Sequence, residues 1–252
     1  MPSCPPPVPD TIAALLERAR AARDASALAE GRDLAERAWA LALRSGSADE
    51  RADAGELLCL LHYRLGALAA LLDVGRDVVP LLNTPPRRAA QADLLRWMAL
   101  AGCETGAFEQ ALRHASDVCA LAQELGDRRQ LALSLTTLGA CFERMGDPWQ
   151  AERLMDDALR VAHDLDDPFV QLVTLNNLCA VCIGAFYVLR GGEPAEATAA
   201  LRRALVHARE AHSLLPHFSD PFFSVFVEGN LGEVLVHLGK ADEARGLLES
   251  AL

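Results

Sequence analysis

The most constraining feature of this 252-residue chain is a spaced pattern of small residues that occurs twice. Its members are Gly139, Gly146, Ala151, Met155 and Ala158, and then, with the same spacing, Gly232, Gly239, Ala244, Leu248 and Ala251. Small residues at these intervals predict two antiparallel helices whose backbones cross closely, joined by a glycine turn. Tandem helix pairs form a scaffold that binds through its surface, so the pattern argues against an enclosed catalytic pocket.

Composition supports an all-α protein. Ala and Leu dominate and aromatic residues make up only 5% of the chain, a bias that favours closely packed helices over a sheet. The 24 Lys and Arg residues against 35 Asp and Glu give a net charge of −11, which opposes direct binding of nucleic acid. Seven scattered cysteines show no disulfide spacing, which favours a reducing cytoplasm.

Anchoring the repeat on the small residue after each turn predicts six helix pairs, with anchors at Ala27, Leu71, Ala111, Ala151, Ala197 and Ala244. We expect helices at about 10–22, 26–44, 49–65, 67–82, 87–105, 107–125, 128–145, 148–165, 168–190, 194–214, 221–238 and 241–252. An aspartate directly before a proline predicts a capped helix start, and this pair occurs at Asp147, Asp167 and Asp220. We interpret Asp127 and Thr84 in the same way.

We expect residues 1–9, which are rich in proline, to be disordered and residues 10–252 to form a single helical repeat domain. Leu252 falls inside the second helix of the last pair, so a missing C-terminal region is expected to follow. The uncharged stretch from Phe169 to Leu189 contains several amide and hydroxyl side chains, so we expect a buried helix there and no membrane contact.

Two segments resemble the tetratricopeptide repeat family, in the long-repeat variety of bacterial regulators. They read LTTLGACFERMGDPWQAERLMDDAL at 135–159 and GNLGEVLVHLGKADEARGLLESAL at 229–252. The resemblance implies a right-handed superhelical solenoid of about six antiparallel helix pairs. A fifth unit starts in register with LNNLC at 175–179, but its turn comes about six residues late, which predicts a first helix lengthened by more than one turn. Phe186, Tyr187 and Leu189 are then candidates for a cap, a partner contact or a ligand pocket.

The resemblance also implies that the first helix of each pair lines a concave groove that contacts a protein or peptide partner. The corresponding positions are Asp53, Glu56, Tyr63, Arg64, Asp93, Arg96, Trp97, Glu104, Thr136, Thr137, Glu143, Arg144, Asn176, Asn177, Asn230, Glu233 and His237. Asn177 and Asn230 match the family asparagine that bonds a peptide backbone, with a hydrogen bond between helices as the alternative. Trp97 is either a stacking anchor or a core residue, and Trp149 is expected to pack the turn against the adjacent repeat.

No catalytic, metal or cofactor site is expected. Cys179 and Cys182 form a CxxC on one face of an apolar helix, which favours packing over redox chemistry. The seven histidines show no metal-ligand spacing and are interpreted as surface residues, and no phosphate-binding loop or nucleophile motif occurs.

These observations predict a cytoplasmic scaffold without enzyme activity that binds a protein or peptide. The resemblance implies that it acts as the regulatory or sensory module of a larger bacterial signalling protein, with a GGDEF-type diguanylate cyclase, a histidine kinase or a LuxR-type protein as the output. Two alternatives remain open. One is an adaptor or homodimer built through Phe218, Phe222, Phe223 and Phe226; the other is a small-molecule sensor whose pocket is lined by Cys179, Cys182, Phe186 and Tyr187.

Overall fold

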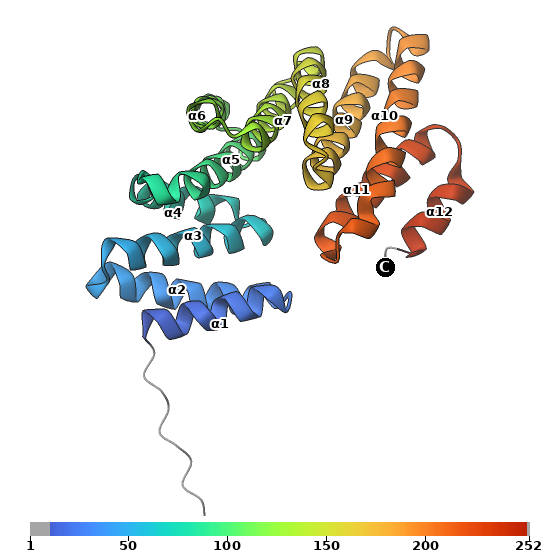
Figure 1. The fold of residues 1–252 in the computed structure, drawn as a ribbon. Helices are drawn as coiled ribbons and strands as arrows, with labels where there is room; N and C mark the ends of the chain where they lie inside the picture. The colour runs from blue at the N-terminus through green and yellow to red at the C-terminus, as the bar shows by residue number, and fades with distance from the viewer. Residues whose placement is uncertain (1–10, 251–252) are drawn as a thin grey trace, which may run out of the picture. The chain divides into compact units, whose positions relative to one another are not determined.

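The computed structural model describes residues 11–250, and all the regular structure in that range is helical (Figure 1). The α-helices are α1 (Ile12–Asp24), α2 (Leu28–Ser45), α3 (Ala48–Arg64), α4 (Leu68–Val78), α5 (Arg88–Glu104), α6 (Phe108–Leu125), α7 (Arg128–Arg144), α8 (Pro148–Leu165), α9 (Pro168–Leu189), α10 (Pro194–Leu214), α11 (Pro221–His237) and α12 (Ala241–Ser250). Every predicted helix is found, and each starts within two residues of its predicted start. The predictions for residues 1–9 and for the end of the last repeat lie outside the described residues.

The helices form two compact units, one ending at Gly106 and the other beginning at Ala107. In the first unit each helix from α1 to α5 packs on the next, and α3 also contacts both α1 and α5. In the second unit α6 to α12 pack in the same consecutive way, and α9 also contacts α7 and α11. Within each unit, successive helices therefore stack as expected for tandem helical repeats.

Four successive first helices begin at a constant interval. Ala48, Arg88, Arg128 and Pro168 start α3, α5, α7 and α9, each 40 residues after the previous one. Helices α2, α4, α6 and α8 keep the same interval, so the small position of the first pair is Gly31, and the anchor placed at Ala27 is wrong. Gly31 is buried, and a Cβ there would lie 3.2 Å from the carbonyl oxygen of Ala19.

The small residues of the repeat lie where two helix backbones approach closely. A Cβ added to Gly139 in α7 would lie 2.8 Å from Cγ of Met155 and 3.1 Å from the carbonyl oxygen of Ala151, both in α8. A side chain at this position would overlap its neighbours, so the structure confirms that Gly139 marks a helix crossing.

Aspartates cap the helices at the predicted starts. The side chains of Asp127, Asp147, Asp167 and Asp220 accept backbone N–H groups in the first turns of α7, α8, α9 and α11. The first unit deviates at two points. Pro80 falls within the predicted helix 67–82, where α4 ends at Val78 and the chain continues as a 3₁₀ turn. Thr84 caps no α-helix, because Pro85 to Arg87 form another 3₁₀ turn before α5.

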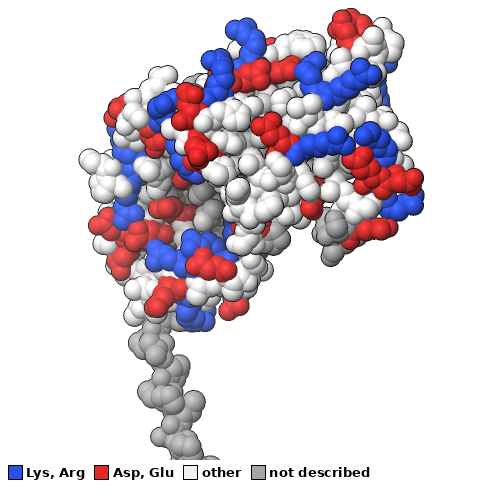
Figure 2. Space-filling view, turned by 45° about the vertical axis from the view of Figure 1, so that its right-hand side comes forward, with Lys and Arg blue, Asp and Glu red and all other residues white. Residues whose placement is uncertain are grey.

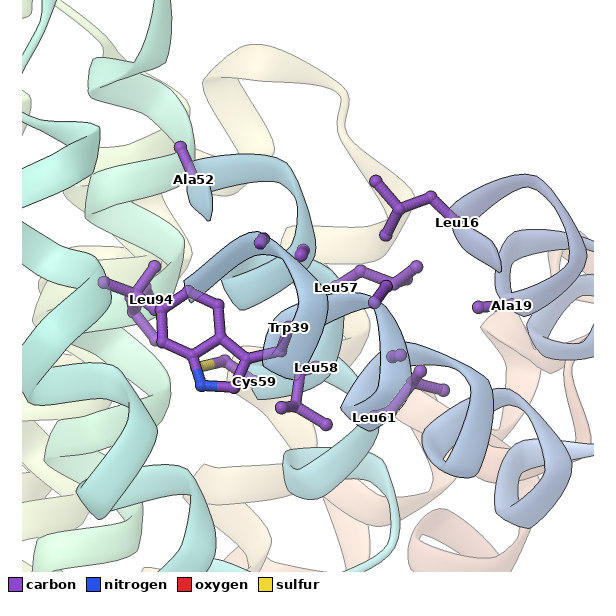
Figure 3. Close-up of a cluster of buried hydrophobic side chains, with 14 of the residues drawn as sticks. Leu16, Ala19, Trp39, Ala52, Leu57, Leu58, Cys59, Leu61 and Leu94 are labelled. Atoms are coloured by element: carbon purple, nitrogen blue, oxygen red, sulfur yellow. The ribbon is translucent and has the colours of Figure 1, made fainter. Parts of the chain in front are cut away.

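Each unit has its own apolar core. In the first unit, one apolar cluster joins Trp39 from α2, the leucines Leu57, Leu58 and Leu61 from α3, and Leu94 from α5, with Trp39 beside Leu94 (Figure 3). In the second unit, α9 is the central helix and contributes buried side chains to several apolar clusters. By composition α9 is the one described helix long and apolar enough to cross a membrane. Half of its apolar stretch is buried inside the structure, which agrees with the predicted core helix.

The fifth pair is longer than the others, as predicted. Helix α9 has 22 residues, whereas α3, α5, α7 and α11 each have 17. Its partner α10 has 21 residues, against 18 in α2, α6 and α8. The five additional residues of α9 correspond to more than one helical turn, and they place Phe186 and Tyr187 at its end.

Candidate functional site

Three asparagines gather on one face of α9 and α11. Asn176, Asn177 and Asn230 are all partly exposed. The Nδ2 group of Asn230 donates to Oδ1 of Asn176 at 3.0 Å and to its backbone oxygen at 3.4 Å. Nδ2 of Asn177 donates to the backbone oxygen of Val173 at 2.7 Å. The hydrogen bond between helices is therefore present, and it orients the amides on the surface.

The contacts of these amides fix which hydrogen-bonding groups face outward. Since Asn177 and Asn230 each approach a carbonyl oxygen, the approaching atom has to be the NH₂ nitrogen. Within the described residues no other group bonds to Nδ2 of Asn176 or to Oδ1 of Asn177 and Asn230. The face thus offers one donor and two acceptors, the two kinds of group that pair with a polypeptide backbone.

The added turn of α9 is attached to α11 through Tyr187. Its hydroxyl lies 2.9 Å from Oε1 of Glu233 and 2.8 Å from Nε2 of His237. A carboxylate only accepts, so Tyr187 donates to Glu233 and His237 donates to the phenol oxygen. The hydrogen bond to Glu233 raises the pKa of Tyr187 above its ordinary value. The ring of Phe186 lies 4.9 Å from that of His237, and the guanidinium of Arg190 lies 4.8 Å from the centre of the Tyr187 ring.

Two predicted groove threonines are buried. Oγ1 of Thr137 donates to the backbone oxygen of Leu133 in its own helix, and Thr136 bonds Thr174 of α9 at 2.9 Å. The Thr136 hydroxyl joins α7 to α9, whereas the Thr137 hydroxyl is satisfied within α7. Thr137 is buried and not available to a ligand, so its assignment as a partner-binding residue is corrected. The sequence pattern missed this because a threonine satisfies its hydroxyl within its own helix.

Two further predicted groove residues, Glu143 and Arg144, lie at the C-terminal end of α7. Oε1 of Glu143 lies 3.2 Å from the position that a Cβ of Gly184 would take, so this carboxylate rests against the α9 backbone. The Arg144 side chain lies 3.6 Å from the carboxylate of Glu143.

In the first unit the predicted residues of α3 and α5 also share one partly exposed face. Tyr63 and Trp97 stack with their ring centres 5.8 Å apart and an interplanar angle of 16°, and both pack against the core. Trp97 therefore packs against the core, which is one of its two predicted roles, and its ring stays partly exposed. Arg96 is only 11% exposed, and its Nη2 pairs with Asp93 at 3.2 Å.

The remaining polar residues of this face are Glu56, Arg64 and Glu104. Burial raises the pKa of the Glu56 carboxyl; Arg87 opposes this shift, and the carboxylates of Asp53 and Asp93 add to it. Arg87 bonds both Asp49 and Asp53, and sequence reasoning missed it because it precedes the first helical turn of α5. Arg64 is partly exposed and Glu104 is exposed at the end of α5.

The cysteines of α9 and one of the histidines are buried among the packed helices. Burial raises the pKa of the Cys179 and Cys182 thiols to about 12, so neither is poised as a nucleophile. Within residues 11–250, His, Cys, Asp and Glu form no cluster of three that could hold a metal ion. His62 is buried, which corrects the interpretation of all histidines as surface residues. Trp149 is 50% exposed, so about half of its surface is left to pack the turn as predicted.

The aromatic residues at the start of α11 divide into partly buried and exposed members. Phe218 and Phe223 pack edge-on against Phe169 with ring centres 6.4 and 5.8 Å away, whereas Phe226 is exposed. On the face shown in Figure 2, acidic and basic side chains are interspersed and do not gather into a large area of one sign.

The chain is similar to known proteins in part of its sequence and in its fold. Residues 90–163 match the family model of the tetratricopeptide repeat. No curated protein sequence matches the chain significantly. Among solved structures, NprR in complex with its cognate peptide NprX superposes with a TM-score of 0.67 at 15% identity, covering 98% of this chain and 68% of NprR.

Two further structures share the fold. A Rap protein complexed with Competence and Sporulation Factor has a TM-score of 0.62 at 13% identity, with coverage of 94% of this chain and 67% of the Rap chain. BtubC from P. vanneervenii has a TM-score of 0.56 at 17% identity, with coverage of 96% and 90%. Residues 90–163 therefore match the repeats of the tetratricopeptide family, and the chain as a whole shares the helical repeat fold of these solved structures.

Proposed function

We propose that this scaffold binds an extended segment of a partner protein across α9 and α11, with Asn176, Asn177 and Asn230 contacting the backbone of that segment. The observation that carries the proposal is the oriented donor and acceptor pattern on the asparagine face. An extended backbone presents N–H and C=O groups that pair with this pattern irrespective of side chains. Neighbouring Tyr187, Glu233 and His237 are placed to select a side chain of the bound segment.

The comparisons support a peptide ligand in general terms. Among proteins with the same fold, NprR was solved in complex with its cognate peptide NprX, and a Rap protein was solved in complex with Competence and Sporulation Factor. We further propose that the scaffold is the cytoplasmic regulatory module of a larger bacterial signalling protein, with a GGDEF-type diguanylate cyclase as one output. A reading frame that encodes no output domain next to these repeats would contradict this part of the proposal.

Peptides of about 12 residues, about as long as an extended segment that crosses two helices, test the binding face. A displayed random library is selected on the intact chain, and the affinities of the selected peptides are then measured by calorimetry for Asn177→Ala and Asn230→Ala. Losing one or two hydrogen bonds is expected to weaken binding about tenfold. Asn83→Ala is the matched control, since Asn83 is exposed in a turn of the first unit and is expected to leave affinity unchanged.

Peptides methylated on single backbone nitrogens provide a second measurement. If the asparagines read the backbone, methylation at one or two positions weakens binding to the unaltered chain and has little additional effect on Asn177→Ala. Selected peptides that bind Asn177→Ala and Asn230→Ala as tightly as the unaltered chain would refute the proposed site, provided both variants keep the native melting temperature.

A further inference from the structure

One side of α11 is apolar and exposed. Val225, Phe226 and Val236 are 63%, 53% and 55% exposed, and Gly229 lies among them with no atom within 4 Å of the position that its Cβ would take. These four residues, called the α11 stripe below, follow the three- and four-residue spacing that places side chains on one side of a helix. Large apolar side chains gathered along several helical turns mark an interaction surface more often than isolated ones do.

The α11 stripe repeats the positions through which α9 receives α11. Since α9 starts at Pro168 and α11 at Pro221, equivalent residues are 53 positions apart. Val225, Gly229 and Val236 then correspond to Leu172, Asn176 and Ile183 of α9.

Those three α9 residues all face α11. Leu172 and Ile183 belong to apolar clusters shared with α11, and Asn176 accepts the hydrogen bond from Asn230. The side of α11 that carries the stripe is therefore shaped to receive another helix in the way that α9 receives α11 itself.

The charges beside the α11 stripe are acidic. Helix α11 contains no Lys or Arg, and its carboxylates, Glu228 and Glu233, lie on either side of the line that joins Val225, Gly229 and Val236 around the helix. Glu228 lies 3.8 Å from His212 of α10, and Glu233 accepts the hydrogen bond from Tyr187. A second copy docking through the same stripe would bring two acidic helices together. A helix with basic residues beside its apolar side would instead gain from charge complementarity.

We propose that the α11 stripe binds an amphipathic α-helix of a partner protein, in which Lys or Arg residues flank an apolar side. The stripe adjoins the asparagine face, since Phe226 and Asn230 are one helical turn apart and Glu233 lies beside both. The two proposals nevertheless use different side chains: the amides would contact an extended segment, and the stripe would contact a helix. Burying two valines and a phenylalanine gives the contact its affinity, and Gly229 lets the partner backbone approach closely.

A synthetic amphipathic helix of about 18 residues, roughly the length of α11, tests this surface. Its apolar side carries Leu at three- and four-residue spacing, and its flanks carry Lys in one version and Glu in the other. Fluorescence anisotropy measures binding to the intact chain. We expect the Lys version to bind at least about tenfold more tightly than the Glu version and than a scrambled Lys peptide, with the difference shrinking at high salt.

Two serine substitutions locate the contact. Val225→Ser and Val236→Ser are expected to weaken the Lys peptide about tenfold without changing the melting temperature, because both side chains are exposed. Val206→Ser is the matched control, since Val206 is 62% exposed on α10, and it is expected to bind normally. Asn177→Ala is also expected to bind the helix normally, so failure of this proposal is distinguishable from failure of the proposed peptide site.

Four outcomes would overturn the proposal. Equal binding to the unaltered chain, Val225→Ser and Val236→Ser would place the contact elsewhere. Equal affinity for the Lys and Glu peptides would remove the charge argument. A dimer in light scattering that dissociates on Val236→Ser would identify a second copy as the occupant. A longer natural polypeptide that no longer binds the Lys peptide would show that the chain covers the stripe itself.

Discussion

At the residue scale, the crossing of α7 and α8 depends on the absence of a side chain at Gly139. Valine at this position would overlap Met155 and the Ala151 carbonyl, so we expect Gly139→Val to lower the free energy of unfolding by about 1–3 kcal/mol. Chemical denaturation monitored by circular dichroism measures the change. Gly246 in α12 has open space around its Cβ position, so Gly246→Ala is the control and is expected to stabilise slightly. Equal effects of the two substitutions would contradict a close crossing.

The buried imidazole of His62 makes stability depend on pH. Desolvation lowers its pKa below the ordinary value of 6.5, because the folded chain resists protonating a buried ring. As the pH falls below 6.5, the unfolded chain takes up a proton that the folded chain does not, so stability decreases. We expect a lower melting temperature at pH 5 than at pH 7.5, and a smaller difference in His62→Met. An unchanged difference in that variant would assign the effect to other groups, such as His114 and His207, whose pKa values burial also lowers.

Residue identities predicted the candidate site only in part. The spacing placed Asn176, Asn177 and Asn230 on adjoining helices, and the structure brings them together. It did not reveal that Thr137 is buried or that Tyr187 bonds both Glu233 and His237, contacts that span 46 and 50 residues. Periodicity gives the side of a helix on which a residue lies, whereas the partner of a side chain depends on how far the neighbouring helix extends.

At the scale of helices, hydrogen bonds of Tyr187 join the end of α9 to α11. Replacing Tyr187 by Phe keeps the ring beside Arg190 and removes the hydrogen bonds to Glu233 and His237. These contacts are largely exposed, so we expect a small loss of stability, roughly 0.5–1.5 kcal/mol. Hydrogen exchange should show faster exchange of the last turn of α9, including the Arg190 amide that bonds Phe186, with the middle of α9 unchanged. Unchanged exchange at the end of α9 would mean that packing alone holds it.

Helix boundaries were predictable because local signals mark them. Asp147 and Asp167 precede prolines, and their carboxylates cap α8 and α9 as expected. The exceptions have local causes too: Pro80 removes the N–H that would continue α4, and a glycine, Gly31, replaces the alanine used to anchor the first pair.

At the scale of the whole molecule, the two units have separate cores and are expected to unfold at different denaturant concentrations. Trp39 and Trp97 pack in the first unit, whereas Trp149 is largely solvated in the second. In Trp149→Phe the fluorescence therefore reports the first unit alone, while circular dichroism reports helices of both. We expect the two urea transitions to have different midpoints. Coincident curves would show that the described helices unfold as one cooperative body.

The constant 40-residue interval from α3 to α9 also means that experimental knowledge can be transferred along the chain. The same position in α3, α5, α7 and α9 is occupied by Leu58, Met98, Leu138 and Leu178. All of these except Leu138 are fully buried. A mutational scan of one such helix would therefore serve as a template for interpreting variants in the other three. From α9 to α11 the interval between helix starts grows to 53 residues, so the template does not extend to α11. Variants of α11 have to be measured individually.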